Sequence, residues 1–100
     1  MAEYTVVLAP NEDSELWSVT CPAMPGCLSQ GEGRDGALRN ILEAMEGWLL
    51  VSREFGEAPV EETPELIAQQ ISFVLAWKAE EGWPLLVETA RVTMREPVAA

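Results

Sequence analysis

The amino-acid sequence predicts one α+β domain with two layers, in which an antiparallel-rich sheet carries helices on one of its faces. Three observations predict this class: early segments alternate as strands do, two later segments have helical periodicity, and a segment rich in Val and Thr follows them. The chain has 100 residues, and 48% of them are hydrophobic, which is too apolar for disorder. We therefore expect residues 1–100 to form a single domain around one core.

The N-terminal third is predicted to form three strands. Residues 3–9 alternate and are dominated by β-branched side chains, and residues 16–21 alternate again. The turn-forming residues 10–14 between them favour an antiparallel hairpin with a long loop. Two prolines and a glycine within residues 22–26 end the second strand, so residues 27–31 are expected to form a short third strand.

Two helices and a last strand are predicted to follow. Residues 35–54 are expected to be an amphipathic helix. Its apolar stripe is Leu38, Ile41, Leu42, Met45, Trp48 and Leu49. A second helix, over residues 63–82, is indicated by Thr63 as its cap, Pro64 at its first position and Gly82 at its end. Residues 85–95 are rich in Val and Thr and favour a final strand.

The charge of the chain excludes several classes of ligand. Seventeen Asp and Glu stand against six Lys and Arg, a net charge of −11, which repels phosphate backbones and anionic lipids. We expect no direct binding of nucleic acid or membrane. The same field attracts a basic protein, although it is equally consistent with a solvated surface. Because no signal peptide or membrane-spanning run is present, a cytoplasmic protein is expected.

Catalytic, cofactor and metal sites are not predicted. Without histidine, Cys21 and Cys27 lack the partners of a zinc site, so structural thiols are expected, with one exposed reactive cysteine as the alternative. A two-metal nuclease would need converging acids. The candidates for such a cluster are Asp13, Glu15, Glu43 and Glu46. Their positions in a turn and on the polar side of the first helix favour solvated acids instead.

The aromatic residues of the second helix predict an interface. Trp48 lies on the core stripe of the first helix, so we expect it to pack in the core. Leu66, Phe73 and Trp77 form a second apolar stripe that so small a core cannot cover. Together with Trp83 they are predicted to bind a partner or a second copy, most simply in a homodimer. Burial of this stripe by Trp83 and the last strand is the alternative.

Residues 3–55 resemble the HicB-like antitoxin family. The resemblance is carried by Tyr4-Thr5-Val6-Val7-Leu8, by Asp13 and Trp17-Ser18-Val19, by Pro22-Ala23-Met24-Pro25-Gly26-Cys27-Leu28-Ser29-Gln30-Gly31, and by Ala37, Asn40, Glu43 and Ala44. It implies a partial RNase H-like βββαβ fold that has lost nuclease chemistry. In toxin–antitoxin pairs such a protein binds and masks a small basic ribonuclease called HicA. The extra helix 63–82 and the strand 85–95 elaborate this core.

Two departures from the family pattern shape the functional hypothesis. Before the first helix the family has Asp-Thr or Asp-Ser, but here Glu32-Gly33-Arg34-Asp35-Gly36 stands, so capping is expected to pass to Asp35 or rest on Gly33. Residues 91–100 are too short for the family's C-terminal DNA-binding module. We therefore predict a non-catalytic antitoxin or an orphan relative that does not bind an operator. The alternative is a small oligomeric regulatory or housekeeping protein without a toxin.

Overall fold

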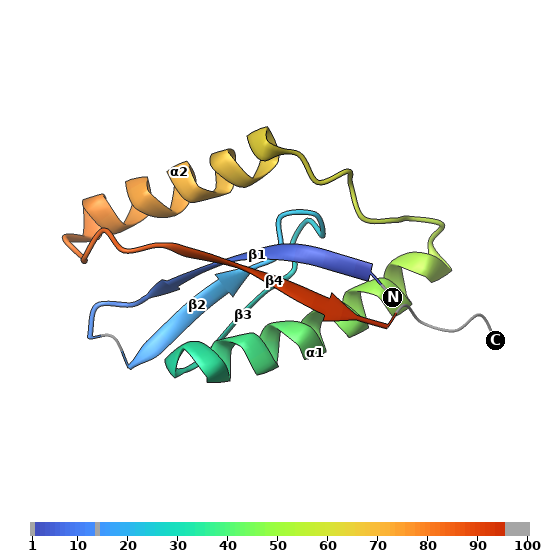
Figure 1. The fold of residues 1–100 in the computed structure, drawn as a ribbon, viewed down its shortest axis with the longest axis horizontal. Coiled ribbons are helices and arrows are strands. Elements are labelled where there is room, and N and C mark those ends of the chain that lie inside the picture. Colours follow the sequence, from blue (N-terminus) through green and yellow to red (C-terminus); the bar gives the residue numbers. More distant parts are fainter. Residues whose placement is uncertain (1, 14, 96–100) are drawn as a thin grey trace.

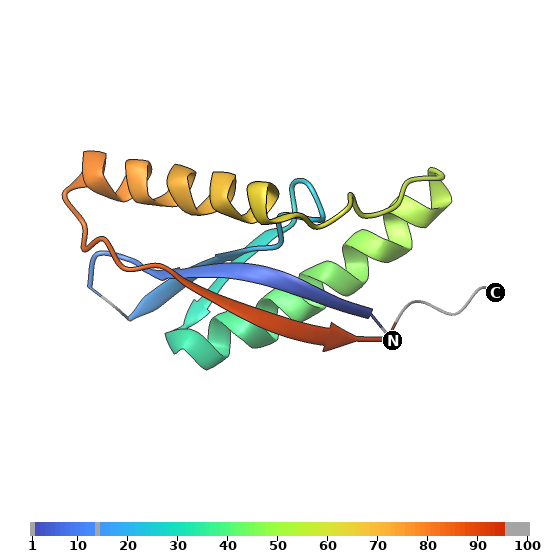
Figure 2. The ribbon, with the colours of Figure 1, turned by 45° about the horizontal axis from the view of Figure 1, so that its top comes forward.

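A four-stranded antiparallel sheet lies between two helices (Figures 1 and 2). The computed structural model describes residues 2–13 and 15–95. Its elements, in chain order, are β1 (Ala2–Pro10), β2 (Leu16–Thr20), β3 (Leu28–Glu32), α1 (Gly33–Glu54), α2 (Pro64–Glu81) and β4 (Glu88–Met94). The predicted α+β class and the order of its elements are confirmed.

The strands are arranged in the order β3-β2-β1-β4, so β2 and β1 are the inner strands and β3 and β4 form the edges. β1 pairs with β2 as the predicted hairpin, with Leu8 opposite Val19. β4 returns from the far end of the chain and pairs with β1 over seven residues, with Val6 opposite Ala90. The final strand thus closes the sheet beside the first one.

α1 covers one face of the sheet and forms the core with it. Val6 and Leu8 of β1 meet Ile41 and Met45 of α1, and all four side chains are fully buried. Trp48 is half-buried against this cluster, as predicted, and its Nε1 donates to a backbone carbonyl in the preceding loop at 3.0 Å. The whole apolar stripe of α1 therefore packs on this sheet face, with Ile41 and Met45 at its buried centre.

The second helix lies on the opposite face, so the prediction of both helices on one face is wrong. In Figures 1 and 2, α2 and α1 lie on either side of the sheet. Val7 and Ala9 alternate with the core residues of β1, and they face the side chains of α2. The physical reason is that α1 already covers the first face, whereas β1 is apolar on both of its faces and offers α2 a second surface.

The junction between β3 and α1 is packed at backbone level. A Cβ atom on Gly31 would lie 2.4 Å from the carbonyl carbon of Gly36, so only glycine fits there. The predicted capping by Asp35 or Gly33 is wrong. Glu32 occupies the N-cap without a side-chain hydrogen bond, and the N–H of Gly33 donates to the carbonyl of Glu15 at 2.8 Å. Strand pairing thus fixes this end of α1.

Both ends of α2 follow the predicted signals. The Oγ1 of Thr63 accepts from the N–H of Leu66 at 3.1 Å, and Gly82 ends the helix with φ of 72°. The last strand begins three residues later than predicted. Its pairing with β1 starts at Glu88, opposite Leu8, and the carbonyl of Leu86 accepts a side-chain hydrogen bond from α2 instead.

Candidate functional site

An apolar groove runs between α2 and the open part of the sheet. α2 lies above β1, which leaves the neighbouring surface of β2 and β3 uncovered on this face. The groove has a volume of about 560 Å³. Its lining residues are Val7, Ala9, Ser18, Val19, Thr20, Leu28, Ser29, Gln30, Gln70, Phe73, Val74 and Trp77. None of these described lining residues is charged, in a chain with a net charge of −11.

The structure brings three of the four predicted interface residues together at this groove. Phe73 and Trp77 line it, and 69% of Phe73 and 37% of Trp77 are exposed. The ring of Trp83 packs against Trp77 edge to face, with centroids 4.8 Å apart. Leu66 is half-buried and does not contribute to the lining. On the opposite wall Leu28 is 68% exposed, so apolar side chains border the groove on both sides.

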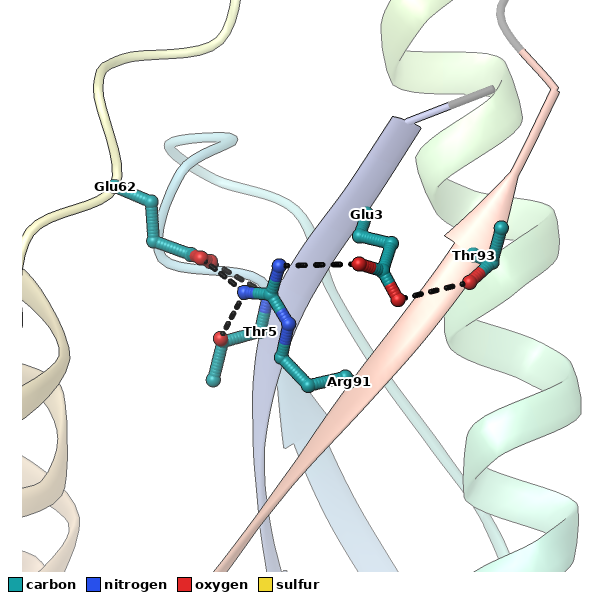
Figure 3. Close-up of polar contacts among 5 residues, drawn as sticks. All are labelled: Glu3, Thr5, Glu62, Arg91 and Thr93. Atoms are coloured by element: carbon teal, nitrogen blue, oxygen red, sulfur yellow. Dashed lines mark hydrogen bonds and ion pairs between the residues drawn. The ribbon is translucent and has the colours of Figure 1, made fainter.

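A polar cluster fastens the segment before α2 to the sheet (Figure 3). The carboxylate of Glu62 accepts from the N–H of Thr5 and from the guanidinium of Arg91, which also donates to the Oγ1 of Thr5 at 2.8 Å. Glu3 forms an ion pair with Arg91 at 3.7 Å and accepts from Thr93. This network ties the linker, β1 and β4 together and sets where α2 begins.

Lys78 holds the other end of α2. It is the one fully buried residue of this helix, every position of which the structure describes, and its Nζ donates to the carbonyl of Leu86 at 2.7 Å. Burial lowers the pKa of Lys78. Sequence reasoning missed this residue. The available signal was its spacing, because Ile71, Val74 and Leu75 predict that the next inward position is 78.

The candidate catalytic groups do not converge. Asp13 and Glu15 are exposed in the β1–β2 loop, and Glu43 and Glu46 are exposed on α1. Within the described residues, no group of three or more potential metal ligands comes together. Cys21 and Cys27 are buried free thiols, and burial raises the pKa of Cys21 to about 11. A thiol with so high a pKa is a poor nucleophile at neutral pH.

Among the described residues, neither helix has the length and apolar character needed to cross a membrane. The groove, with Phe73 and Trp77 on one wall and Leu28 on the other, is the candidate functional site.

Comparison with known proteins defines the class. Residues 4–79 match the family model described as HicB_like antitoxin of bacterial toxin-antitoxin system. Because this match spans more than half of the chain, the protein belongs to the HicB-like antitoxin family. The resemblance noted for residues 3–55 is thereby confirmed, and the match extends through most of α2.

Two relatives support this membership. A UPF0150 protein of Thermoplasma acidophilum is 40% identical over 47 residues, which cover 47% of this chain and 67% of that protein. The crystal structure of the N-terminal domain of the Burkholderia pseudomallei antitoxin HicB matches with a TM-score of 0.60 and 29% identity. That match covers 94% of this chain and 99% of the solved domain.

Proposed function

We propose that this protein is a non-catalytic antitoxin that binds and masks a small basic ribonuclease of the HicA type. The observation that carries the proposal is the uncharged apolar groove beside α2 in an otherwise acidic protein of an antitoxin family. An apolar centre surrounded by charge is the usual anatomy of a specific protein interface. The partial RNase H-like fold that the family resemblance implies is compatible with a domain in which the described acids do not converge.

The surface charge supports a basic partner. Lys78 is buried, while Arg34 and Arg91 are engaged in ion pairs with Glu88 and with Glu62. Each of these ion pairs neutralises one acid locally, and the seventeen acids still outnumber the six cations and leave a net charge of −11. In Figures 1 and 2 the C-terminal end of α2 and the β1–β2 loop lie at the same end of the molecule. Both segments carry acids, so negative charge gathers at that end of the molecule.

The test is co-expression with a small basic ribonuclease encoded next to this protein in its source. We expect the two chains to co-purify and the ribonuclease activity to be suppressed, with an association rate that falls steeply as salt is added. A neighbouring ribonuclease that stays free and active in the presence of the folded protein contradicts the proposal. Stable oligomers without any such partner would support the alternative of a regulatory protein that has no toxin.

The groove is tested by paired charge substitutions. Phe73→Glu with Trp77→Glu places two acids in the groove wall and should abolish capture of the ribonuclease. The matched control is Leu50→Glu with Phe55→Glu, because both residues are exposed on the α1 side, at 54% and 73%. The control should retain capture. Equal loss in both variants would mean that added charge, and not the groove, decides binding.

The proposal includes the absence of direct nucleic-acid binding. With a net charge of −11, any phosphate approaching the protein meets a repulsive field. We expect no gel shift of the DNA upstream of the coding sequence by the protein alone. A specific, salt-sensitive complex near micromolar concentration would refute this part of the proposal.

A further inference from the structure

The two edges of the sheet differ in how their backbone groups are used. Thr5 lies opposite Arg91, yet its N–H donates to Glu62 instead of β4. In an antiparallel pair, opposite residues either bond to each other or both point away, and the two patterns alternate along the strand. Thr5 and Arg91 are thus a non-hydrogen-bonded pair, in which the backbone N–H and C=O of each residue point away from the other strand. The N–H and C=O groups of Thr89, Arg91 and Thr93 therefore point out of the sheet.

Within the described part of the chain, a side chain caps one outward backbone group of β3, whereas no side chain caps those of β4. The N–H of Cys21 donates to the carbonyl of Cys27 at 3.1 Å, so these two residues are a hydrogen-bonded pair that continues the β2–β3 ladder. Because hydrogen-bonded pairs alternate along the strands, the backbone N–H and C=O of Gln30 point away from β2. The carbonyl of Gln30 accepts from the side chain of Asn40 at 2.7 Å. Among the residues that the structure describes, none bonds to the outward backbone groups of β4.

β4 has few of the features that prevent strand addition, and its two charged side chains, Glu88 and Arg91, are already held in ion pairs. Its sequence, Glu-Thr-Ala-Arg-Val-Thr-Met, has no proline, glycine or lysine, and its β-branched residues favour an extended strand. On the α1 side, Val92 and Met94 are buried parts of the core. A strand added here would continue that apolar layer beyond the present edge.

Charge identifies a second copy as the partner of this edge. The net charge of −11 opposes self-association over most of the surface. The outward row of β4 contains one cation and no acid, and the carboxylate of Glu88 is already paired with Arg34 at 3.1 Å. A twofold axis at Val92 would place Arg91 opposite Thr93 of the other copy, which avoids like charges directly across the strands.

We propose that β4 pairs antiparallel with β4 of a second copy and joins the two four-stranded sheets into one. This inference does not depend on the proposed toxin, because it uses the sheet edge and not the groove. It also differs from the dimer predicted through α2, which stays a prediction. The two modes involve different residues and are separable by mutation.

The test uses a proline whose missing N–H affects only the open edge. Thr89→Pro removes an outward donor from each copy without removing a bond to β1, and Thr89→Ala keeps the donor as the matched control. In analytical ultracentrifugation over a concentration series, we expect a wild-type dimer. Thr89→Pro should raise its dissociation constant about tenfold or more, and Thr89→Ala should leave it nearly unchanged.

Hydrogen exchange supplies a readout that does not depend on the folding of a variant. The outward amides of Thr89, Arg91 and Thr93 should become protected as the wild-type concentration rises, while the amide of Ala90 is protected throughout by β1. A wild-type monomer at all concentrations overturns the proposal. So does a dimer with freely exchanging outward amides, or one that Phe73→Glu with Trp77→Glu dissociates while Thr89→Pro does not.

Discussion

The two faces of the central sheet are built differently. On the α1 face, Val6 and Leu8 meet Ile41 and Met45, and all of these side chains are fully buried. On the α2 face, Lys78 is the single fully buried residue of a helix whose 18 positions are all described. One face is thus a filled core and the other is a partly covered apolar surface. The difference indicates that stability comes mainly from the first face, while the second keeps an exposed apolar surface.

The means of attachment differ in the same way. α1 follows β3 directly and is positioned by apolar packing and by the close approach of Gly31 to Gly36. α2 is held at its two ends by polar contacts, through Glu62 at its start and Lys78 near its end. A helix anchored at its ends can present its remaining side chains, including Phe73 and Trp77, to a partner.

The largest expected effect tests the filled face. Ile41→Ala removes a fully buried side chain from the α1 face and should lower the free energy of unfolding by about 2–5 kcal/mol. The matched change on the other face is Val74→Ala, because Val74 is half-buried and lines the open groove. It should cost about 1 kcal/mol or less. Urea unfolding measures both, and equal losses would contradict the contrast between the faces.

A somewhat smaller effect is expected at the β3–α1 junction. In Gly31→Ala the new methyl group would lie 2.4 Å from a backbone atom, so the strand or α1 must shift, at a cost of about 1–3 kcal/mol or more. Gly47→Ala is the control, because Gly47 lies within α1 and no atom would lie within 4 Å of its new methyl group. It should stabilise the protein by about 0.5–1 kcal/mol. If Gly31→Ala is as stable as wild type, the close junction is not required.

The sequence predicted the α1 face well because its signals are local. The alternate residues Val6 and Leu8 and the stripe containing Ile41 and Met45 both line the core, so periodicity reveals them. The bounds of α2 were equally accessible, since Thr63 and Gly82 act on their own helix ends.

The placement of α2 could not be predicted in the same way. Which sheet face a second helix covers depends on what the first helix has already covered and on the path of the linker, and both are long-range properties. Glu62 and Thr5 are 57 residues apart in the sequence, so no local pattern predicts their contact. Phe73 and Trp77 were recognised as an uncovered stripe, but their opposite wall in β2 and β3 became visible only with the tertiary structure.

The pH dependence of stability tests the anchor of α2. Burial lowers the pKa of Lys78 below its ordinary 10.5, so above that lowered value the native protein has released a proton that the unfolded chain still holds. The free energy of unfolding should therefore gain a contribution that rises with pH up to about 10.5. Lys78→Met removes this contribution.

The titration of Cys21 changes the free energy of unfolding with the opposite sign. The effect of Lys78 is therefore measured as the difference between wild type and Lys78→Met. Its native pKa is raised from 9.0 to about 11, and its stabilising contribution is present below pH 9.0 and is lost as the pH rises toward 11. Both proteins contain Cys21, and subtracting their free energies of unfolding cancels it. Parallel curves from pH 8 to 11 for wild type and Lys78→Met would show that Lys78 titrates alike in the native and unfolded states.

The smallest effect on stability is expected for a substitution in the groove wall, where the effects on folding and on binding should differ most. Phe73 is 69% exposed, so Phe73→Ser removes little buried area and should change the free energy of unfolding by no more than about 0.5 kcal/mol. An aromatic side chain at the centre of an interface is a typical binding hot spot, so the same change should weaken capture of a basic ribonuclease about tenfold or more. Urea unfolding and a binding titration on the same samples measure the two quantities. A large loss of stability would mean that Phe73 belongs to the core, whereas unchanged binding would mean that the partner uses another surface.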